Sequence, residues 1–508
     1  MKLPPHLVWP LLLVLMRPLP AQAAHANPTT NVVRVGVIGA GRIGLVHLEA
    51  LNACPTAKPL IISNPTLQKA KNAADQYPGV QYTDDENQVI NHPDVDAVWI
   101  CSPSQFHADQ ITACANAGKH IFCEKPLATE LDETIKAVSL CREKKVKLMT
   151  ALQRRFDPNF ARVKKSIENG DIGELVCVKL CSRDPAPPPF NYVKGGGGIF
   201  KDMAVHDLDM ARYLMGSEPI AVLASGSCQV SPEIKQLEGP EAFDTASIIV
   251  KFANGKEAII DVCRQAPYGY DQRAEVLGTK GMIMTDNMHP STARIFTEEF
   301  VGHADLPYNF FMSRYKEAYK LETMAFVDAL NADLPAPCSG RDGLVALIMA
   351  IAAGISSQEE RWVRFEEVLQ REEIGGLHAP LAVEEDGTDG SGWVKNALRG
   401  IKVRDPSSSA DLEELFYLFD NDYDGKLSVR QVIDAIHLLC EDGACPNFSG
   451  DEIQAMVKKV DTDGDGQISF DEFLVMWREA GNSVEGEGAS SVREGVGKFL
   501  GSFFSRAA

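Results

Sequence analysis

What this sequence lacks excludes several classes of protein. It has no basic excess, because 50 lysines and arginines stand against 70 aspartates and glutamates, a formal net charge of −20 over 508 residues. Nucleic-acid phosphates are bound by basic surfaces, so this balance argues against a nucleic-acid partner. The 12 cysteines include no CxxC pair and no zinc-like spacing, and we interpret them as mostly buried thiols. A hydrophobic share of 45% excludes a disordered chain. The length of 508 residues predicts roughly three domains.

The N-terminal residues 1–24 lack both acidic side chains and an apolar run long enough to span a bilayer. The run Leu7–Met16 precedes Ala21-Gln22-Ala23, a small-residue pattern typical of signal-peptide cleavage. The first acidic residue is Glu49, and this absence of acids makes an organelle transit peptide, or a bipartite signal, the second interpretation. Unpaired cysteines fit a reducing destination slightly better. We expect a targeting segment for the secretory pathway or an organelle, with the compartment left open.

A glycine-rich loop lies between a predicted strand and a predicted helix. The β-branched run at 32–38 runs into GAGRIG at 39–44, and an apolar periodic segment continues to Leu51. GxGxxG in this context predicts dinucleotide binding: the first glycine allows the tight turn, the second the approach of the pyrophosphate, and the third close packing of helix on strand. The predicted cofactor contacts in this loop are Gly39, Gly41, Arg42, Ile43 and Gly44.

The next predicted strand, 59–62, lacks the acid at its end that NAD enzymes commonly use to bind a ribose. Ser63 and Asn64 stand there instead, and either side chain can bind a ribose hydroxyl. Lys69 and Lys71 follow in the next predicted helix, as an NADP enzyme would favour. The sequence therefore predicts NAD or NADP without choosing between them.

Strands and helices continue to alternate through 86–126, which predicts a doubly wound parallel sheet with ligands at the carboxyl ends of its strands. Ser102 ends one such strand, and Glu124 and Lys125 end another. We assign Ser102 and Glu124 to the cofactor. A lysine at this position can stabilise a developing alkoxide, although a lysine at a strand end is more often merely solvated.

The stretch from Gly195 to Met215 carries an unusual density of ionisable groups. Asp202 and His206 are four residues apart, a helical spacing that brings a carboxylate within hydrogen-bonding reach of an imidazole. The pair is a candidate general base with its orienting acid. The alternative is a helix N-terminus decorated with acids that favour the positive end of the helix dipole.

These motifs, together with QRRFDPNF at 153–160 and GDIGE at 170–174, resemble in order and spacing the Gfo/Idh/MocA oxidoreductase family over roughly residues 32–370. The segments at 182–189 and 264–282 are most similar to its inositol dehydrogenases. The resemblance implies an NAD(P)-binding Rossmann domain at 32–150. It also implies a substrate-binding α/β domain at 151–370 with a large open, mainly antiparallel sheet that often forms a homo-oligomer.

The resemblance also implies roles for individual residues. His206 would take a proton from a ring hydroxyl, Asp202 would orient His206 and raise its basicity, and Lys125 would stabilise the alkoxide-like transition state. We expect Asp207 and Asp209 to cap the helix or to contact substrate. Candidate substrate contacts are Arg154, Asp184 and Tyr270, although a structural role is the stronger interpretation of Arg154.

The implied reaction is NAD(P)-dependent oxidation of a ring hydroxyl of myo-inositol, or a related cyclitol, to the ketone. Ring stereochemistry is read by pocket geometry, so another sugar or polyol dehydrogenase of the family stays open.

A linker-like stretch at 371–410 separates this enzyme body from a second motif set. The loop at 461–472 fits an EF-hand calcium loop, with ligands predicted at Asp461, Asp463, Asp465, Gln467 and Glu472. A preceding loop offers Asp420, Asp422, Asp424 and Lys426, the last through its carbonyl. Its twelfth position is Gln431 in place of glutamate, which predicts a weaker site or one that favours magnesium.

We therefore expect an all-α EF-hand pair at 411–480, followed by a flexible or amphipathic tail at 481–508 that can lie on a membrane. Two classes of function remain. The first is a calcium-controlled polyol dehydrogenase, and the second is a calcium sensor or scaffold with an inactive oxidoreductase body. The intact glycine loop, Lys125, Asp202 and His206 favour the first.

Overall fold

The structure is a computed structural model that describes residues 32–371 except 195 and 300, together with 426–428, 458, 461, 467–469 and 472–473. The predicted targeting segment, linker and C-terminal tail lie outside the described residues. Within the described part, all ten cysteines are free thiols and most are buried, as the sequence predicted.

The first domain is a six-stranded, fully parallel sheet in the order β3-β2-β1-β4-β5-β6. Its strands are β1 (Val33–Ile38), β2 (Ala57–Ser63), β3 (Gln81–Thr83), β4 (Ala97–Ile100), β5 (His120–Glu124) and β6 (Leu148–Ala151). The helical segments between them are α2 (Arg42–Ala53), α3 (Leu67–Ala74), α4 (Glu86–Ile90), η2 (Ser104–Phe106), α5 (His107–Asn116) and α6 (Leu131–Glu143). This confirms the predicted doubly wound Rossmann sheet.

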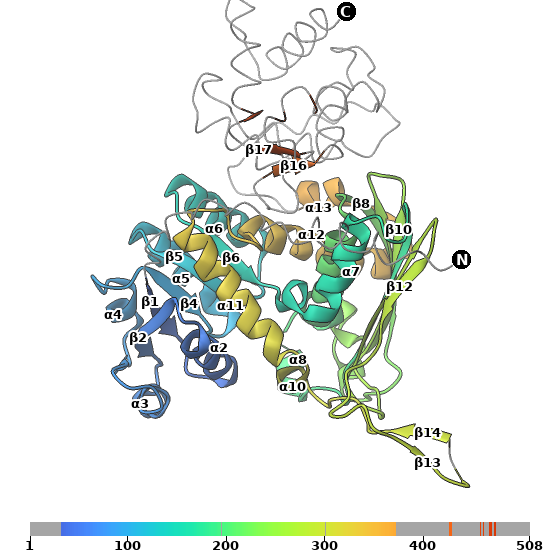
Figure 1. Ribbon diagram of the computed structural model, residues 1–508, viewed down its shortest axis with the longest axis horizontal. Helices are drawn as coiled ribbons and strands as arrows, with labels where there is room; N and C mark the ends of the chain where they lie inside the picture. Colours follow the sequence, from blue (N-terminus) through green and yellow to red (C-terminus); the bar gives the residue numbers. More distant parts are fainter. Residues whose placement is uncertain are drawn as a thin grey trace, which may run out of the picture.

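Helices cover both faces of this sheet (Figure 1). The strands are therefore buried on both faces, which is why their sequences are continuous apolar runs. Every residue of β4 is buried. One core lies between the sheet and α2, α3 and the later helix α11 (Lys316–Asn331), and the other lies between the sheet and α4, α5 and α6. Helix α11 thus returns to the first domain, where Phe326 and Val327 complete its core.

The second domain is built on a seven-stranded sheet in the order β12-β11-β7-β10-β9-β8-β15. All neighbours are antiparallel except β7 and β10, which confirms the predicted, mainly antiparallel sheet. Its strands are β7 (Leu175–Arg183), β8 (Pro219–Ser227), β9 (Thr245–Phe252), β10 (Glu257–Cys263), β11 (Asp271–Gly278), β12 (Met282–Thr285) and β15 (Val363–Arg364). A separate hairpin, β13 (Arg294–Phe296) and β14 (Val301–Ala304), extends away from the sheet (Figure 1).

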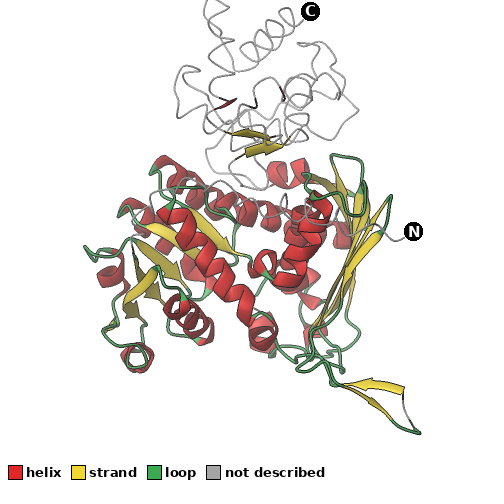
Figure 2. Cartoon of the chain, in the orientation of Figure 1, coloured by secondary structure: helices red, strands yellow, loops and turns green. Residues whose placement is uncertain are grey.

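Among the described residues, helices cover only one face of this sheet, as Figure 2 shows. Buried residues therefore alternate with more exposed ones, as along β10. The remaining helical segments are η3 (Gln153–Phe156), α7 (Pro158–Glu168), α8 (Phe190–Val193), η4 (Phe200–Ala204, a π-helix), α9 (Val205–Met215), η5 (Ile234–Gln236), η6 (Gly239–Ala242), α10 (Phe311–Arg314), α12 (Gly340–Glu359) and α13 (Phe365–Arg371).

Helix α12 packs against β8 and α9 in the middle of this domain. Among the described helices it is the one long and apolar enough to cross a membrane, but most of it is buried in the protein core.

In the C-terminal region the structure describes one short antiparallel pair, β16 (Lys426–Ser428) with β17 (Gln467–Ser469). Leu427 and Ile468 lie opposite each other in this pair, and both are buried. The pair joins the two predicted calcium loops at corresponding positions. Of the rest of the two loops, only Asp461 and Glu472 are among the described residues.

Candidate active site

The glycine loop has the geometry that a dinucleotide requires. Gly39 has φ +105°, and a Cβ there would lie 2.6 Å from the carbonyl oxygen of Cys101. A Cβ on Gly44 would lie 2.0 Å from the carbonyl oxygen of Gly39, whereas a Cβ on Gly41 would meet no atom within 4 Å. Gly41 is also the N-cap of α2 and supplies no side chain to its free N–H groups. The loop therefore fits a bound pyrophosphate, with open space and N–H donors where the phosphates would lie.

Arg42 and Ile43, the first two residues of α2, extend toward the second domain. The Arg42 guanidinium lies over the rings of Phe310 and Phe311, 5.3 and 5.6 Å from their centroids. Ile43 is partly buried against the cores of both domains. Their cofactor contacts stay predictions.

At the end of β2, Ser63 and Asn64 have different environments. The Ser63 side chain is buried, and its hydroxyl has no partner within the described residues. The partly exposed Asn64 accepts a hydrogen bond from the Ala40 backbone N–H at 3.1 Å and so supports the glycine loop. A ribose contact by Ser63 does not fit this burial, which leaves Asn64 as the accessible side chain.

The ends of β4 and β5 are held by hydrogen bonds to side chains of neighbouring helices. The Ser102 hydroxyl donates to Gln110 at 2.5 Å, and Glu124 lies 2.7 Å from Nε2 of the buried His47 on α2. His107 contacts the carbonyl oxygens of both Ser102 and Pro126. These contacts fix the two strand ends that carry Ser102, Glu124 and Lys125.

Lys125 and Asp202 meet between the two domains. The Lys125 ammonium donates to the backbone carbonyl of Asp202 at 2.8 Å and lies 3.5 Å from its carboxylate. Both side chains are mostly buried, with 19% and 14% of their surface exposed. The lysine at the end of β5 is therefore held against the π-helical turn η4.

Two residues that the sequence did not single out also hold Asp202. Both terminal nitrogens of Arg264, which follows β10, lie 3.2 Å from one carboxylate oxygen. The hydroxyl of Tyr192 donates to the other at 2.9 Å. Burial alone would raise the pKa of Asp202, but Lys125, Arg264 and Tyr192 outweigh it and leave the pKa below its usual value. Asp202 is therefore an ionised carboxylate.

The predicted hydrogen bond between Asp202 and His206 is wrong. Residues 200–204 form a π-helix, in which residues four apart lose the alignment of an α-helix. The carboxylate of Asp202 is satisfied by Arg264, Tyr192 and Lys125, and Nδ1 of His206 is buried without a partner in the described residues.

His206 is a neutral imidazole at physiological pH. Burial, and then the positive charges of Lys125 and Arg154, lower its pKa well below 6.5. The expected rise in the basicity of His206 is wrong, because burial and these two positive charges set its pKa and Asp202 is not among the causes. An unprotonated imidazole is nevertheless the form that can accept a proton.

Two of the predicted substrate residues carry unused hydrogen-bonding groups beside this cluster. The carboxylate of Asp184 and the phenol of the buried Tyr270 make no hydrogen bond within the described part of the chain. Burial raises the pKa of Asp184 to about 6, against the positive charges of Arg264, Arg154 and Lys125. The charges of Lys125 and Asp202 act on Asp184, and Asp184 in turn acts on Tyr270, so Asp184 lies between this cluster and Tyr270.

Arg154, Asp207 and Asp209 have structural partners. Arg154 donates to Asp207 at 2.8 Å and to Ser182 at 3.0 Å, all buried. Arg155 binds both oxygens of Asp209, at 2.9 and 2.6 Å. Both aspartates form ion pairs that tie α9 to η3, which the sequence did not predict. Both oxygens of Asp209 are held by Arg155, so Asp209 is a structural residue. The second oxygen of Asp207, Oδ2, has no partner in the described residues, so its expected contact with the helix or the substrate stays a prediction. Arg154 forms one of these ion pairs, in agreement with the structural role that we favoured for it.

Of the predicted calcium ligands, the described residues include Lys426, Asp461, Gln467 and Glu472. The Glu472 carboxylate is buried and accepts hydrogen bonds from the backbone and hydroxyl of Ser469, both at 2.8 Å. The other predicted ligands, Asp420, Asp422, Asp424, Asp463 and Asp465, lie outside the described residues.

Fold and site together define a dehydrogenase that uses a nicotinamide dinucleotide. Residues 33–152 match the model of the oxidoreductase family with an NAD-binding Rossmann fold, and 160–284 match the GFO/IDH/MocA C-terminal domain. Residues 409–478 match an EF-hand domain pair. The chain belongs to the Gfo/Idh/MocA oxidoreductase family and carries a C-terminal EF-hand pair.

Known relatives include several inositol dehydrogenases. The chain is 40% identical over 337 residues to the myo-inositol 2-dehydrogenase of Thermotoga maritima, covering 66% of this chain and 100% of that protein. It is 41% identical over 332 residues to the inositol 2-dehydrogenase of Rhizobium meliloti, covering 65% and 98%. The solved scyllo-inositol dehydrogenase of Lactobacillus casei, with bound NAD(H) and scyllo-inositol, is 27% identical with a TM-score of 0.61 and covers 66% and 100%.

Proposed function

We propose that this chain oxidises a ring hydroxyl of myo-inositol, or of a related cyclitol, to the ketone with NAD⁺, and that its C-terminal module binds calcium. The observation that carries the proposal is the neutral His206 in a site where Lys125 and Asp202 form an ion pair at the end of β5. The relatives that act on inositols, one of them solved with NAD(H), support this substrate class and favour NAD over NADP.

The residues of this chain divide the chemistry between them. The glycine loop would hold the dinucleotide, whose nicotinamide would supply the acceptor for the hydride of the carbinol carbon. His206 accepts the hydroxyl proton, for which its lowered pKa keeps it unprotonated. Lys125 supplies the positive charge beside the oxygen as negative charge develops there. Asp202 positions Lys125 through its backbone carbonyl and its carboxylate.

Substrate selection falls to the groups with free hydrogen-bonding capacity. An ionised Asp184 accepts hydrogen bonds from ring hydroxyls, and the Tyr270 phenol can donate or accept one. A ring that carries a hydroxyl on each carbon offers hydrogen-bond partners to both the Asp184 carboxylate and the Tyr270 phenol. Another sugar or polyol of similar size is the alternative substrate.

Calcium binding by the EF-hand pair is supported by the second loop, whose twelfth-position Glu472 is buried and oriented by Ser469. Pairing of β16 with β17 couples the two loops, so occupation of one affects the other. Control of catalysis by calcium is the stronger form of this proposal. The weaker form is a module for stability or location.

A homo-oligomer is also part of the proposal. The uncovered face of the second sheet exposes large apolar side chains in neighbouring strands, namely Val176, Ile259, Leu277, Met282 and Met284. Exposed apolar surface of this kind marks an interaction site. Light scattering on the full chain tests this proposal, and a monomer at all concentrations would contradict it.

The experiment for the reaction follows formation of reduced nicotinamide by the full chain with myo-inositol, scyllo-inositol or glucose and either NAD⁺ or NADP⁺. We expect turnover of a cyclitol with NAD⁺. His206→Asn should lower kcat by about 100-fold to 10,000-fold with little change in cofactor affinity. His303→Asn, on the exposed strand β14, is the matched control and should leave kcat unchanged. No turnover with any substrate would contradict the enzyme and favour a calcium-binding scaffold.

A further inference from the structure

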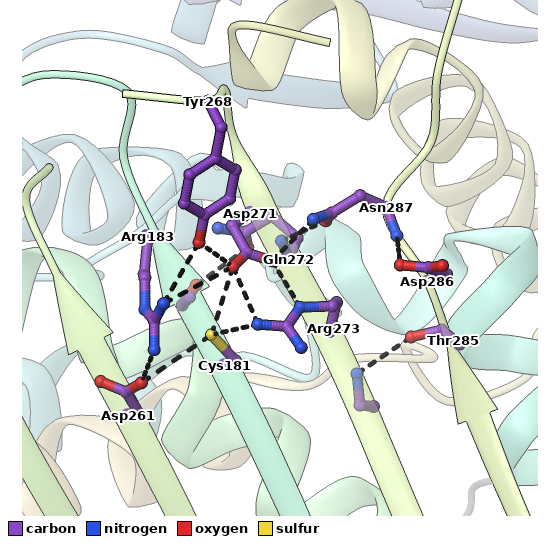
Figure 3. A network of polar contacts seen from close by, with 12 residues as sticks. Cys181, Arg183, Asp261, Tyr268, Asp271, Gln272, Arg273, Thr285, Asp286 and Asn287 are labelled. Atoms are coloured by element: carbon purple, nitrogen blue, oxygen red, sulfur yellow. Dashed lines mark hydrogen bonds and ion pairs between the residues drawn. The ribbon is translucent and has the colours of Figure 1, made fainter. Parts of the chain in front are cut away.

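A dense polar cluster lies on the uncovered face of the second sheet, at the end of the strands nearest the site (Figure 3). Its centre is Asp271, the first residue of β11. The cluster comprises Cys181, Arg183, Asp261, Tyr268, Asp271, Arg273 and Asn287. None of these residues takes part in the chemistry proposed above.

Asp271 is a fully satisfied buried carboxylate. It is 1% exposed and receives hydrogen bonds from the Tyr268 hydroxyl at 2.6 Å, from Arg273 at 2.7 and 2.9 Å, and from the Asn287 amide at 2.7 Å. Burial would raise the pKa of Asp271, but these hydrogen bonds lower it to about 2. The charge is therefore present throughout the physiological range and fixes its donors in place.

The cluster closes a loop that carries a site residue at each end. Residues 264–270 connect β10 to β11, and Arg264 at the start holds Asp202. Tyr270 at the end immediately precedes Asp271. Asp271 and Gln272, successive residues of β11, point to opposite faces, and Gln272 accepts a hydrogen bond from Tyr315 on the inner face. Tyr270 packs edge-on against the same Tyr315, so fixing Asp271 on the outer face also fixes the backbone that places Tyr270 on the inner face. Tyr268, within the loop, is held by the same carboxylate.

The neighbouring strand is held by the same cluster. Arg183 lies opposite Asp271 in the register of β7 and β11, pairs with Asp261 on β10, and donates to the Tyr268 hydroxyl at 3.2 Å. Arg183, the last residue of β7, immediately precedes Asp184, whose backbone N–H donates to the carbonyl oxygen of Cys263 at 2.9 Å. Fixing Arg183 therefore fixes the backbone that carries Asp184. One outer cluster therefore supports both side chains assigned to the substrate.

We propose that Asp271 is a positioning residue that sets the placement of Tyr270 and Asp184, and with it the affinity for the cyclitol and the choice between cyclitol stereoisomers. This inference rests on the proposed function. The competing explanation is a carboxylate that only stabilises the fold, and the two differ in what they do to substrate and cofactor separately.

The test compares Asp271→Asn and Tyr268→Phe with wild type in the full chain. Asparagine keeps the size but loses the charge that binds Arg273, and phenylalanine removes one hydrogen bond without changing charge. We expect Asp271→Asn to raise the KM for myo-inositol at least about tenfold, in keeping with a misplaced substrate contact. We expect kcat and the KM for NAD⁺ to change little, and the ratio of kcat/KM for myo-inositol over scyllo-inositol to shift. Tyr268→Phe should produce a smaller change in the same direction.

The matched control is Glu275→Gln, on the same strand and face as Asp271, where Glu275 forms an exposed ion pair with Lys179 at 3.1 Å. It should leave all constants unchanged. Calorimetric titration of myo-inositol into the chain with NADH gives a Kd that does not depend on turnover. An inactive wild type would contradict the proposed function. An unchanged Kd in both variants, or a parallel loss of inositol and NADH binding, would overturn the role of Asp271.

Discussion

Lys125 donates a hydrogen bond to the backbone carbonyl of Asp202 at 2.8 Å, across the junction of the two domains. Lys125 directly follows β5 of the Rossmann sheet, and Asp202 lies in the π-helical turn before α9. The contact places a positive charge of one domain near His206, the proposed general base of the other. The site is therefore complete only when the two domains keep this geometry.

Arg264 should be required for fast turnover, because it holds the carboxylate of Asp202. Arg264→Met removes both hydrogen bonds to one carboxylate oxygen and so frees Asp202, which holds Lys125. We expect kcat to fall by about 100-fold, the cost of a misplacement of the order of 1 Å, with the KM for NAD⁺ nearly unchanged. Arg264→Lys should recover part of the loss, because it keeps the charge but not the fork. Equal kcat in Arg264→Met and wild type would remove Arg264 from the site.

The pH dependence of turnover should report the lowered pKa of His206. A group whose pKa is lowered keeps its basic form to lower pH. The fall of kcat on the acid side of the pH–rate profile, the acid limb, should therefore lie below pH 6.5 if His206 causes it. Lys125 is one cause of that lowering, so the residual activity of Lys125→Gln should have its acid limb at higher pH than wild type. A limb at or above 6.5 in wild type, or no movement in Lys125→Gln, would contradict this assignment.

Asp184 should produce a separate titration. Its pKa, raised to about 6 by burial, means that the substrate-binding carboxylate is ionised only above that pH. As pH falls through about 6, the KM for the cyclitol should rise while kcat changes less. Asp184→Asn should abolish this step and bind the substrate weakly at every pH. Persistence of the step in Asp184→Asn would assign it to another group.

The glycine loop offers a contrast between two similar substitutions. Gly41→Ala places a methyl group in open space where the pyrophosphate would lie, so NAD binding should weaken by about tenfold to 100-fold while thermal stability stays close to wild type. Gly44→Ala places it 2.0 Å from the Gly39 carbonyl, and should destabilise the domain by about 1–3 kcal/mol. Calorimetry and thermal unfolding separate the two effects, and a destabilised Gly41→Ala would argue against the open site.

Calcium affinity should depend on the twelfth position of each EF-hand loop. Glu472→Gln removes a charge and a bidentate ligand from the second loop, and the calcium affinity of that site should fall at least about tenfold. Gln431→Glu adds the same group to the first loop and should strengthen it. Calorimetry on the full chain measures both, with Glu485→Gln, outside both loops, as the control. Calcium binding unchanged in all three variants would show that the loops are not the sites.

Much of the fold follows from local patterns in the sequence. The β-branched run ending at Gly39 and the alternation of strands and helices fix a parallel sheet, because such strands are buried on both faces. The same topology places Lys125 at a ligand-binding strand end. The return of α11 to the first domain could not be predicted, since its apolar face suits either domain.

The details of the site depend on contacts between distant segments. Arg264 and Asp202 are 62 residues apart, and nothing in their local patterns marks the pair. The four-residue spacing of Asp202 and His206 predicted a hydrogen bond only for an α-helix, and the π-helix there cancels it. The ion pairs of Asp207 and Asp209 could not be predicted, because their arginine partners come from η3, more than 50 residues earlier in the chain.

The most direct measurement uses myo-inositol that carries deuterium at the oxidised ring carbon, with NAD⁺ and the full chain, and follows the label by mass spectrometry. The account predicts that deuterium appears in the reduced nicotinamide, that the ring product is the ketone, and that His206→Asn suppresses the transfer. Reduced nicotinamide without the label, or no transfer by the wild-type chain, would contradict it.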